Sequence, residues 1–198
     1  MALEVKISLE GNPSAALEAA RRPILEGSAR AMTNTLVRHF RERNRSRERK
    51  EGWPRSNYWA KAAESVTSEA GADRAVATVR KEGVRLHWLG GIVRPREGRR
   101  AVAIPNVPEV AGIWPSEYRG KQKSKPTFMV WKAGAQSGFI AAREKGQKGF
   151  RVLWWLREET EHDPDPTVIP SAETFAKAVE KACKAVLKAM KNKTGGVA

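Results

Sequence analysis

The stretch from Val84 to Pro105 constrains the fold more than any other part of the chain, because it concentrates helix- and strand-breaking residues. Gly90 and Gly91 are adjacent, and three further breakers follow them: Pro95, Gly98 and Pro105. The short apolar runs between the breakers alternate with other residues, which predicts short strands joined in hairpins. The stretch holds no nucleophile, carboxylate pair or metal-ligand cluster, so we expect a structural role for it.

The rest of the chain combines strand-like and helical patterns. Residues 3–9 alternate apolar and polar side chains, which predicts a half-buried strand. A helical apolar stripe extends from Leu17 to Phe40, and Pro23 either separates two helices or kinks one. Tyr58 to Ala63 indicates a helical turn. Further strands are predicted at residues 65–70, 75–81, 128–131, 139–142 and 150–156.

The C-terminal region carries the clearest helix pattern. Ser171 is a suitable N-cap, and apolar residues recur at helical spacing from Phe175 to Met190, with lysines on the remaining surface. We therefore expect one α+β domain over residues 1–198. In it, a small, mostly antiparallel sheet packs with a long N-terminal helix and an amphipathic C-terminal helix.

The predicted strand at 150–156 is apolar on both faces. Strict alternation gives one face Phe150, Val152, Trp154 and Leu156, and the other Leu153 and Trp155. A strand of this kind is buried on both faces, either inside a sheet or at a contact between subunits.

Two segments are predicted to extend from the domain. Residues 38–50 carry seven basic and two acidic side chains, distributed around any helix drawn through them. Residues 38–57 thus form a basic arm, which is either a solvated helix end or a surface that contacts an anion. Residues 106–138 contain three prolines and a lysine cluster, which predicts a long irregular loop.

The charge balance predicts an anionic partner. The 198 residues include 37 basic and 22 acidic side chains, for a formal net charge of +15. Nucleic acid, a membrane surface or an acidic protein face would each suit such a chain. The single cysteine, Cys183, excludes an internal disulfide and favours a reducing compartment. Neither a signal peptide nor an apolar run of membrane-spanning length is present, so we expect a soluble protein without membrane contact.

The sequence offers little for catalysis or metal binding. None of its three histidines has a second His or Cys at zinc-ligand spacing. His162, Asp163 and Asp165 are compatible with a hard cation, but the prolines between them favour a rigid connector. The acidic residues 158, 159 and 161 are weak support for a nuclease. Phosphate-binding loops and serine-hydrolase motifs are absent. We expect no catalytic residues, metal or cofactor.

The order of these parts resembles the virion-morphogenesis or tail-completion family of Mu-like long-tailed phages. A glycine–proline core carries most of the resemblance: Gly90, Gly91, Ile92, Val93, Pro95, Ala101, Ala103, Ile104 and Pro105. Residues 166–171 before the last helix support it. The resemblance implies a non-enzymatic virion protein that forms a homo-oligomeric ring, with six copies by analogy with tail symmetry, at the neck between head and tail. Implied partners are neighbouring neck or connector rings, tail-terminator or tail-tube proteins, and the packaged DNA.

We predict that loop tryptophans and clustered cations face a neighbouring subunit or DNA. These candidates are Arg41, Arg43, Arg45, Arg47, Trp53, Arg94, Arg96, Arg99, Arg100, Trp114, Lys121, Lys123, Lys125 and Trp131. The arginines at 94–100 are expected at the tip of a hairpin. A basic nucleic-acid-binding protein is the alternative function, and a nuclease or other enzyme is the third.

Overall fold

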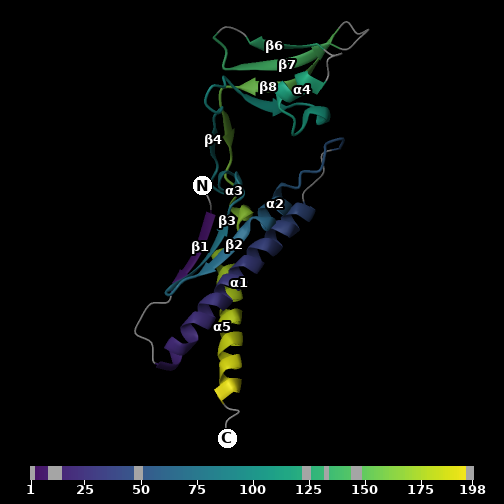
Figure 1. The fold of residues 1–198 in the computed structure, drawn as a ribbon. Helices are drawn as coiled ribbons and strands as arrows, with labels where there is room; N and C mark the ends of the chain where they lie inside the picture. Colours follow the sequence, from purple (N-terminus) through teal and green to yellow (C-terminus); the bar gives the residue numbers. More distant parts are fainter. Residues whose placement is uncertain are drawn as a thin grey trace. The chain divides into compact units, whose positions relative to one another are not determined.

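A computed structural model describes residues 3–8, 15–46, 51–121, 126–131, 134–143 and 149–194. Helices and small antiparallel sheets confirm the expected α+β fold class (Figure 1). The sequence predicts one domain, whereas residue contacts divide the chain into two compact units. Unit 1 comprises residues 1–47, 56–90 and 164–198, and unit 2 comprises residues 48–55 and 91–163.

Unit 1 contains an antiparallel sheet of three strands in the order β1-β3-β2: β1 (Leu3–Ser8), β3 (Arg74–Val79) and β2 (Val66–Ala70). The predicted first strand and the predicted strand pair are both confirmed. Alternate residues of β3, Ala75, Ala77 and Val79, are buried, because successive side chains of a strand point to opposite faces.

The long helix α1 (Ala15–Ser46) provides most of the core of unit 1. It continues through Pro23 as one helix, which decides between the two alternatives left by the sequence. Leu25, Met32, Leu36 and Phe40 are fully buried along one side of it, at the spacing of an amphipathic helix.

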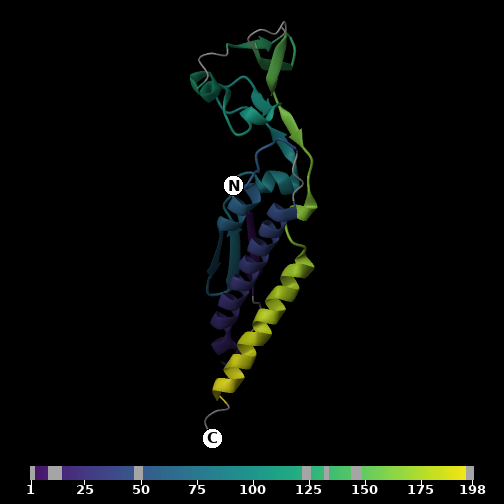
Figure 2. The same cartoon turned by 90° about the vertical axis from the view of Figure 1, so that its right-hand side faces the viewer.

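The C-terminal helix α5 (Ala172–Thr194) lies alongside α1 (Figures 1 and 2). Its N-cap is the predicted one, because the Ser171 hydroxyl accepts a hydrogen bond from the Thr174 backbone N–H over 3.3 Å. The two helices approach closely at Gly27, where a Cβ atom would lie 3.2 Å from Val186 Cγ2.

Two short helices, α2 (Tyr58–Glu64) and α3 (Val84–Leu89), complete the core of unit 1. The strand predicted at 84–88 is wrong, since α3 occupies this region between Gly83 and Gly90, both of which have positive φ. Burial of Val84 and partial burial of Trp88 in the core favour the helical turn over local alternation. The Phe40 ring stacks on Trp59 with centroids 5.7 Å apart.

Unit 2 contains two antiparallel sheets. One is a two-stranded ribbon of β4 (Gly91–Val93) and β9 (Thr160–His162). The other has four strands in the order β5-β8-β7-β6: β5 (Val102–Pro105), β8 (Phe150–Arg157), β7 (Ser137–Arg143) and β6 (Thr127–Trp131). The β7–β8 hairpin was predicted. The hairpin expected within 84–105 is wrong, because β4 and β5 pair with strands far along the chain and belong to different sheets.

The long loop expected at residues 106–138 carries regular structure. Within residues 106–138 lie η1 (Pro108–Val110), α4 (Pro115–Lys121), β6 and the start of β7. Val110 and Tyr118 pack onto the sheet of unit 2, so this segment covers a core. The predicted basic arm is helical as far as Ser46, where α1 ends. A second short 3-10 helix, η2 (Pro166–Val168), precedes α5.

Candidate protein interface

The four-stranded sheet of unit 2 is apolar on both faces. One face packs against η1 and α4, and its central side chain, Trp154, is 1% exposed. The pairing register places other side chains together on the opposite face. They are Ile104, Phe128, Val130, Phe139, Ala141, Phe150, Val152 and Trp155, and we call them the aromatic face.

A β-bulge determines which residues of β8 reach the aromatic face. Ile140 pairs with Trp154 and Ala141 with Val152, so Leu153 is an extra residue in β8. The bulge places Leu153 and Trp154 both in the core. The two faces predicted by strict alternation are therefore wrong, because Trp154 does not share a face with Phe150 and Val152.

Asn106 holds the bulge. Its backbone N–H donates to Leu153 O over 2.8 Å, and its Nδ2 donates to Val152 O over 3.0 Å. Its Oδ1 accepts a hydrogen bond from Trp155 Nε1, also over 3.0 Å. The indole of Trp155 is thus fixed on the aromatic face while its polar atom is satisfied.

Four rings of the aromatic face contact one another in a chain. Phe128 meets Phe150 edge-on with centroids 5.6 Å apart, and Phe139 stacks on Phe150 at the same distance. Phe139 meets Trp155 edge-on at 6.0 Å. These geometries are favourable for aromatic pairs, so the rings form an ordered surface.

Much of this surface is open to solvent. Phe150 is 55% exposed, Trp155 45% and Val130 40%. At ~200 Å² per ring, the two aromatic residues leave roughly 200 Å² of apolar surface in water. Covering that area would contribute about 5 kcal/mol at ~25 cal/mol per Å². The area of the two rings is modest for an interaction site, but aromatic side chains contribute strongly to protein interfaces, which makes this face a candidate contact.

Charged residues border the aromatic face. Arg143, opposite Phe150, and Arg157, opposite Ser137, project on the same face and are exposed. Glu158 and Glu159 follow at the end of β8 and line a surface pocket with Arg157. An apolar aromatic centre within a charged rim is the usual composition of a protein interface.

The predicted contact residues of unit 2 have mostly intramolecular partners. The Arg99 guanidinium lies over Trp114 at 4.6 Å from the ring centroid, and Arg100 lies over Trp131 at 4.5 Å. Arg94 forms an ion pair with Glu159 over 3.4 Å. The remaining candidates in this region are Arg96, which is exposed, and Trp53, which is half-buried. These arginines lie between β4 and β5, so their predicted place at a hairpin tip is wrong.

Among the predicted residues of α1, Arg43 is engaged within unit 1. Its guanidinium pairs with Asp165, donates to the Thr167 hydroxyl over 2.9 Å and lies over the Trp59 ring at 4.8 Å. Arg41 and Arg45 are exposed. Three of the predicted cations, Arg47, Lys123 and Lys125, lie outside the described residues, and of Lys121 only the backbone at the end of α4 is described.

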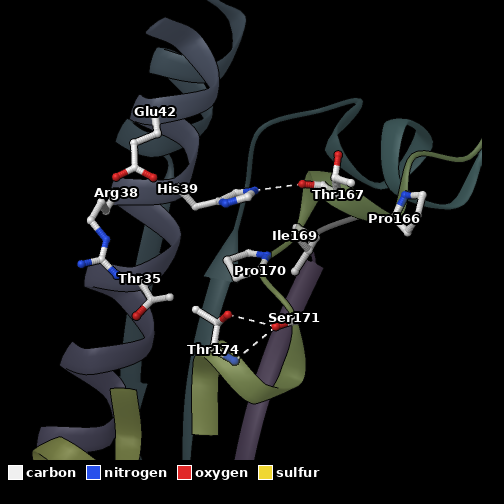
Figure 3. Close-up of a pocket in the computed structure, with 10 residues that line it drawn as sticks. All are labelled: Thr35, Arg38, His39, Glu42, Pro166, Thr167, Ile169, Pro170, Ser171 and Thr174. Carbon is white, nitrogen blue, oxygen red and sulfur yellow. Dashed lines mark hydrogen bonds between the residues drawn. The ribbon is translucent and has the colours of Figure 1, made fainter. Parts of the chain in front are cut away.

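The contacts of Arg43 belong to a larger junction between α1 and the segment before α5, and Figure 3 shows His39 and Thr167 in it. His39 Nε2 donates to the Thr167 carbonyl over 3.0 Å, at an open groove of about 410 Å³. Hydrogen bonds from Thr167, and then the Arg43 guanidinium, hold the pKa of Asp165 below its ordinary value. These interactions fasten the start of α5 to α1.

Within the described ranges, no group of three or more His, Cys, Asp or Glu side chains is arranged to hold a metal ion. None of the described helices is both long and apolar enough to cross a membrane.

The candidate residues proposed from sequence omitted the aromatic face, although the apolar character of both faces of β8 indicated a subunit contact. Phe128 and Phe139 lie on strands whose pairing with β8 brings all four rings together, and a single sequence does not contain that register. No protein-family model, curated protein or solved structure matches the chain.

Proposed function

We propose that the chain is a non-enzymatic structural subunit that assembles with copies of itself, and that the aromatic face of unit 2 is one of its subunit contacts. The exposed rings of Phe150 and Trp155 carry this proposal. Aromatic residues and arginine are enriched in protein interfaces and dominate their binding energy.

A second copy of this chain is the occupant that the surface favours. An apolar patch can pack against the same patch of a second copy, as a twofold contact requires. The rim also carries both signs of charge, with Arg157 close to Glu158 and Glu159. Arginines of one copy can therefore meet glutamates of the other. A standard interface buries ~800 Å² per partner, which is more than the exposed area of the two rings. The rings would therefore form the centre of the interface, and the rest of the aromatic face and its charged rim would complete it.

The resemblance to tail-completion proteins adds a phage setting to the proposal, namely where in a virion the assembly would act. It places the assembly as a ring at the neck of a long-tailed phage, in contact with connector and tail-terminator or tail-tube proteins. A twofold contact through the aromatic face joins two copies, so a ring at the neck requires a head-to-tail contact between subunits in addition.

Oligomeric state tests the proposed contact. The full chain is expected to exceed the monomer mass in light scattering coupled to size-exclusion chromatography and in native mass spectrometry. The double variant Phe150→Ser/Trp155→Ser should shift the assembly toward monomer by at least ~100-fold in dissociation constant, because two central rings are lost. Leu187→Ser is the matched control, since this α5 side chain is also 45% exposed but lies in unit 1.

Thermal unfolding followed by circular dichroism should show that both variants fold. A wild-type chain that is monomeric at every concentration would overturn the proposed contact, as would a double variant that assembles normally. The phage setting has its own test, namely detection of the chain at the neck of purified particles. Its absence from such particles would contradict the setting.

A further inference from the structure

Five lysines lie on one side of α5, opposite the side that packs in unit 1: Lys177, Lys181, Lys184, Lys188 and Lys191. All five are exposed. Successive members are three or four residues apart, so at ~3.6 residues per turn they fall within an arc of about 80° facing away from Phe175. At ~1.5 Å per residue, this lysine stripe extends about 21 Å along the helix.

Carboxylates neutralise only part of the lysine stripe. Glu173 pairs with Lys177 over 2.5 Å, and Glu180 pairs with Lys184. Lys181 and Lys188 form no ion pair with other described residues. Like charges three or four residues apart slightly destabilise a helix, so an anionic ligand along the stripe would relieve this repulsion.

A groove of about 630 Å³ between α1 and α5 extends this positive surface onto the neighbouring helix. Among the described residues, its lining includes three cations, Arg38, Lys177 and Lys181, and no carboxylate. Polar side chains complete the lining and can donate hydrogen bonds: Asn34, Thr35 and Thr174. A groove that offers cations and neutral donors suits the oxygen atoms of a phosphate.

We propose that the lysine stripe and the groove beside it bind the phosphate backbone of double-stranded DNA. Each strand of duplex DNA carries a phosphate every ~3.4 Å of the axis, so a stripe of about 21 Å would run alongside about six phosphates of one strand. Lysines that contact phosphates act as point charges and carry no sequence information, which makes this binding independent of sequence.

The composition of the surface favours DNA over an acidic protein. Protein interfaces are depleted in lysine and enriched in aromatic residues and arginine. The aromatic face of unit 2 has this composition, whereas the lysine stripe in unit 1 has the opposite one. The DNA site requires no second copy of the chain, so it is independent of the proposed assembly.

Fluorescence anisotropy of the full chain with a labelled duplex of about 30 base pairs tests the site, over about 50–300 mM NaCl. The stripe variant Lys181→Gln/Lys184→Gln/Lys188→Gln removes three central charges. A matched control, Lys61→Gln/Arg74→Gln/Arg80→Gln, removes three exposed charges elsewhere in unit 1. Circular dichroism verifies that both variants remain folded.

The stripe variant is expected to bind at least ~10-fold more weakly near 100 mM salt. Its slope of log K against log salt should be smaller by about 2.7, since each lost phosphate contact accounts for ~0.9. The control should change the slope by less than ~1. Equal effects of the two variants would show that only net charge matters and would overturn the site. Polyglutamate binding as tight as DNA binding would overturn the assignment to DNA.

Discussion

Gly138 is the position in unit 2 where one added methyl group should have the clearest effect. A Cβ atom there would lie 2.5 Å from the Val130 carbonyl oxygen and 2.7 Å from Cε3 of Trp131. The carbonyl belongs to the backbone of the adjacent strand β6, so it cannot move away without disturbing the pairing of β6 with β7. The Trp131 ring is also restrained, because Arg100 lies over it at 4.5 Å.

We expect Gly138→Ala to lower the free energy of unfolding by ~2 kcal/mol, within the ~1–3 kcal/mol range of overpacked sites. A chain of 198 residues that unfolds as a whole would then melt about 4–8 °C lower, at ~2–4 °C per kcal/mol. Urea unfolding followed by tryptophan fluorescence gives the free energy, and near-ultraviolet circular dichroism reports displacement of the indole.

Gly149→Ala is the matched control, because a Cβ atom there would meet nothing within 4 Å. It should change the free energy of unfolding by less than ~0.5 kcal/mol. In a Trp131→Ala background, Gly138→Ala should be less destabilising than in the wild type, since only the carbonyl contact remains. A Gly138→Ala variant as stable as the wild type would refute the argument from close approach, and so would equal losses at the two glycines.

Three further predictions concern unit 1. The pKa of Asp165 is lowered by hydrogen bonds from Thr167 and then by Arg43. Its ionised form thus stabilises the fold above pH ~3.9, and this contribution is lost as pH falls through the folded-state pKa. Asp165→Asn should cost under ~1 kcal/mol at pH 7 and nothing at low pH, as urea unfolding at the two pH values would show. Burial raises the pKa of Tyr58 to about 12, so ultraviolet absorbance should show late ionisation of Tyr58 beside that of Tyr118, whose pKa burial also raises. Stability should fall as pH rises from ~10 toward that pKa, and a Tyr58→Phe variant should lack this component. Ser171→Ala removes the N-cap of α5 and should cost ~1 kcal/mol in thermal unfolding, whereas loss of the cap without any effect would contradict its role.

Local patterns predicted those elements in which a strong periodicity coincides with clear ends. The strand β1, the β2–β3 pair, the β7–β8 hairpin and the helix α5 were all expected. Each shows a clear periodicity within one short segment, and the Ser171 cap of α5 is a contact within one turn. These elements could be predicted because the residues that produce the apolar periodicity are also the ones that the element buries.

The errors arose where distant contacts override local preference. Residues 84–89 alternate like a strand but form α3, because Val84 is buried in the core made by α1 and the sheet of unit 1. Strand β5 pairs with β8, about fifty residues later, and not with the nearby β4. Arg43 belongs to a basic run yet is held by Asp165, more than 120 residues away in the sequence.

The sequence by itself determined the α+β class, the strong positive charge, the cap and faces of the last helix, and the doubly apolar character of β8. These properties follow from composition and from spacings of two to four residues. Only the tertiary structure decided which apolar side chains of β8 are exposed. The bulge at Leu153 and the register with β7 place Trp154 in the core and Trp155 on the surface. Likewise, only the packing of α5 on α1 adds Arg38 to the lysine stripe. Side chains far apart in sequence form a surface when the backbone brings them together, and strand register and helix packing supply that information.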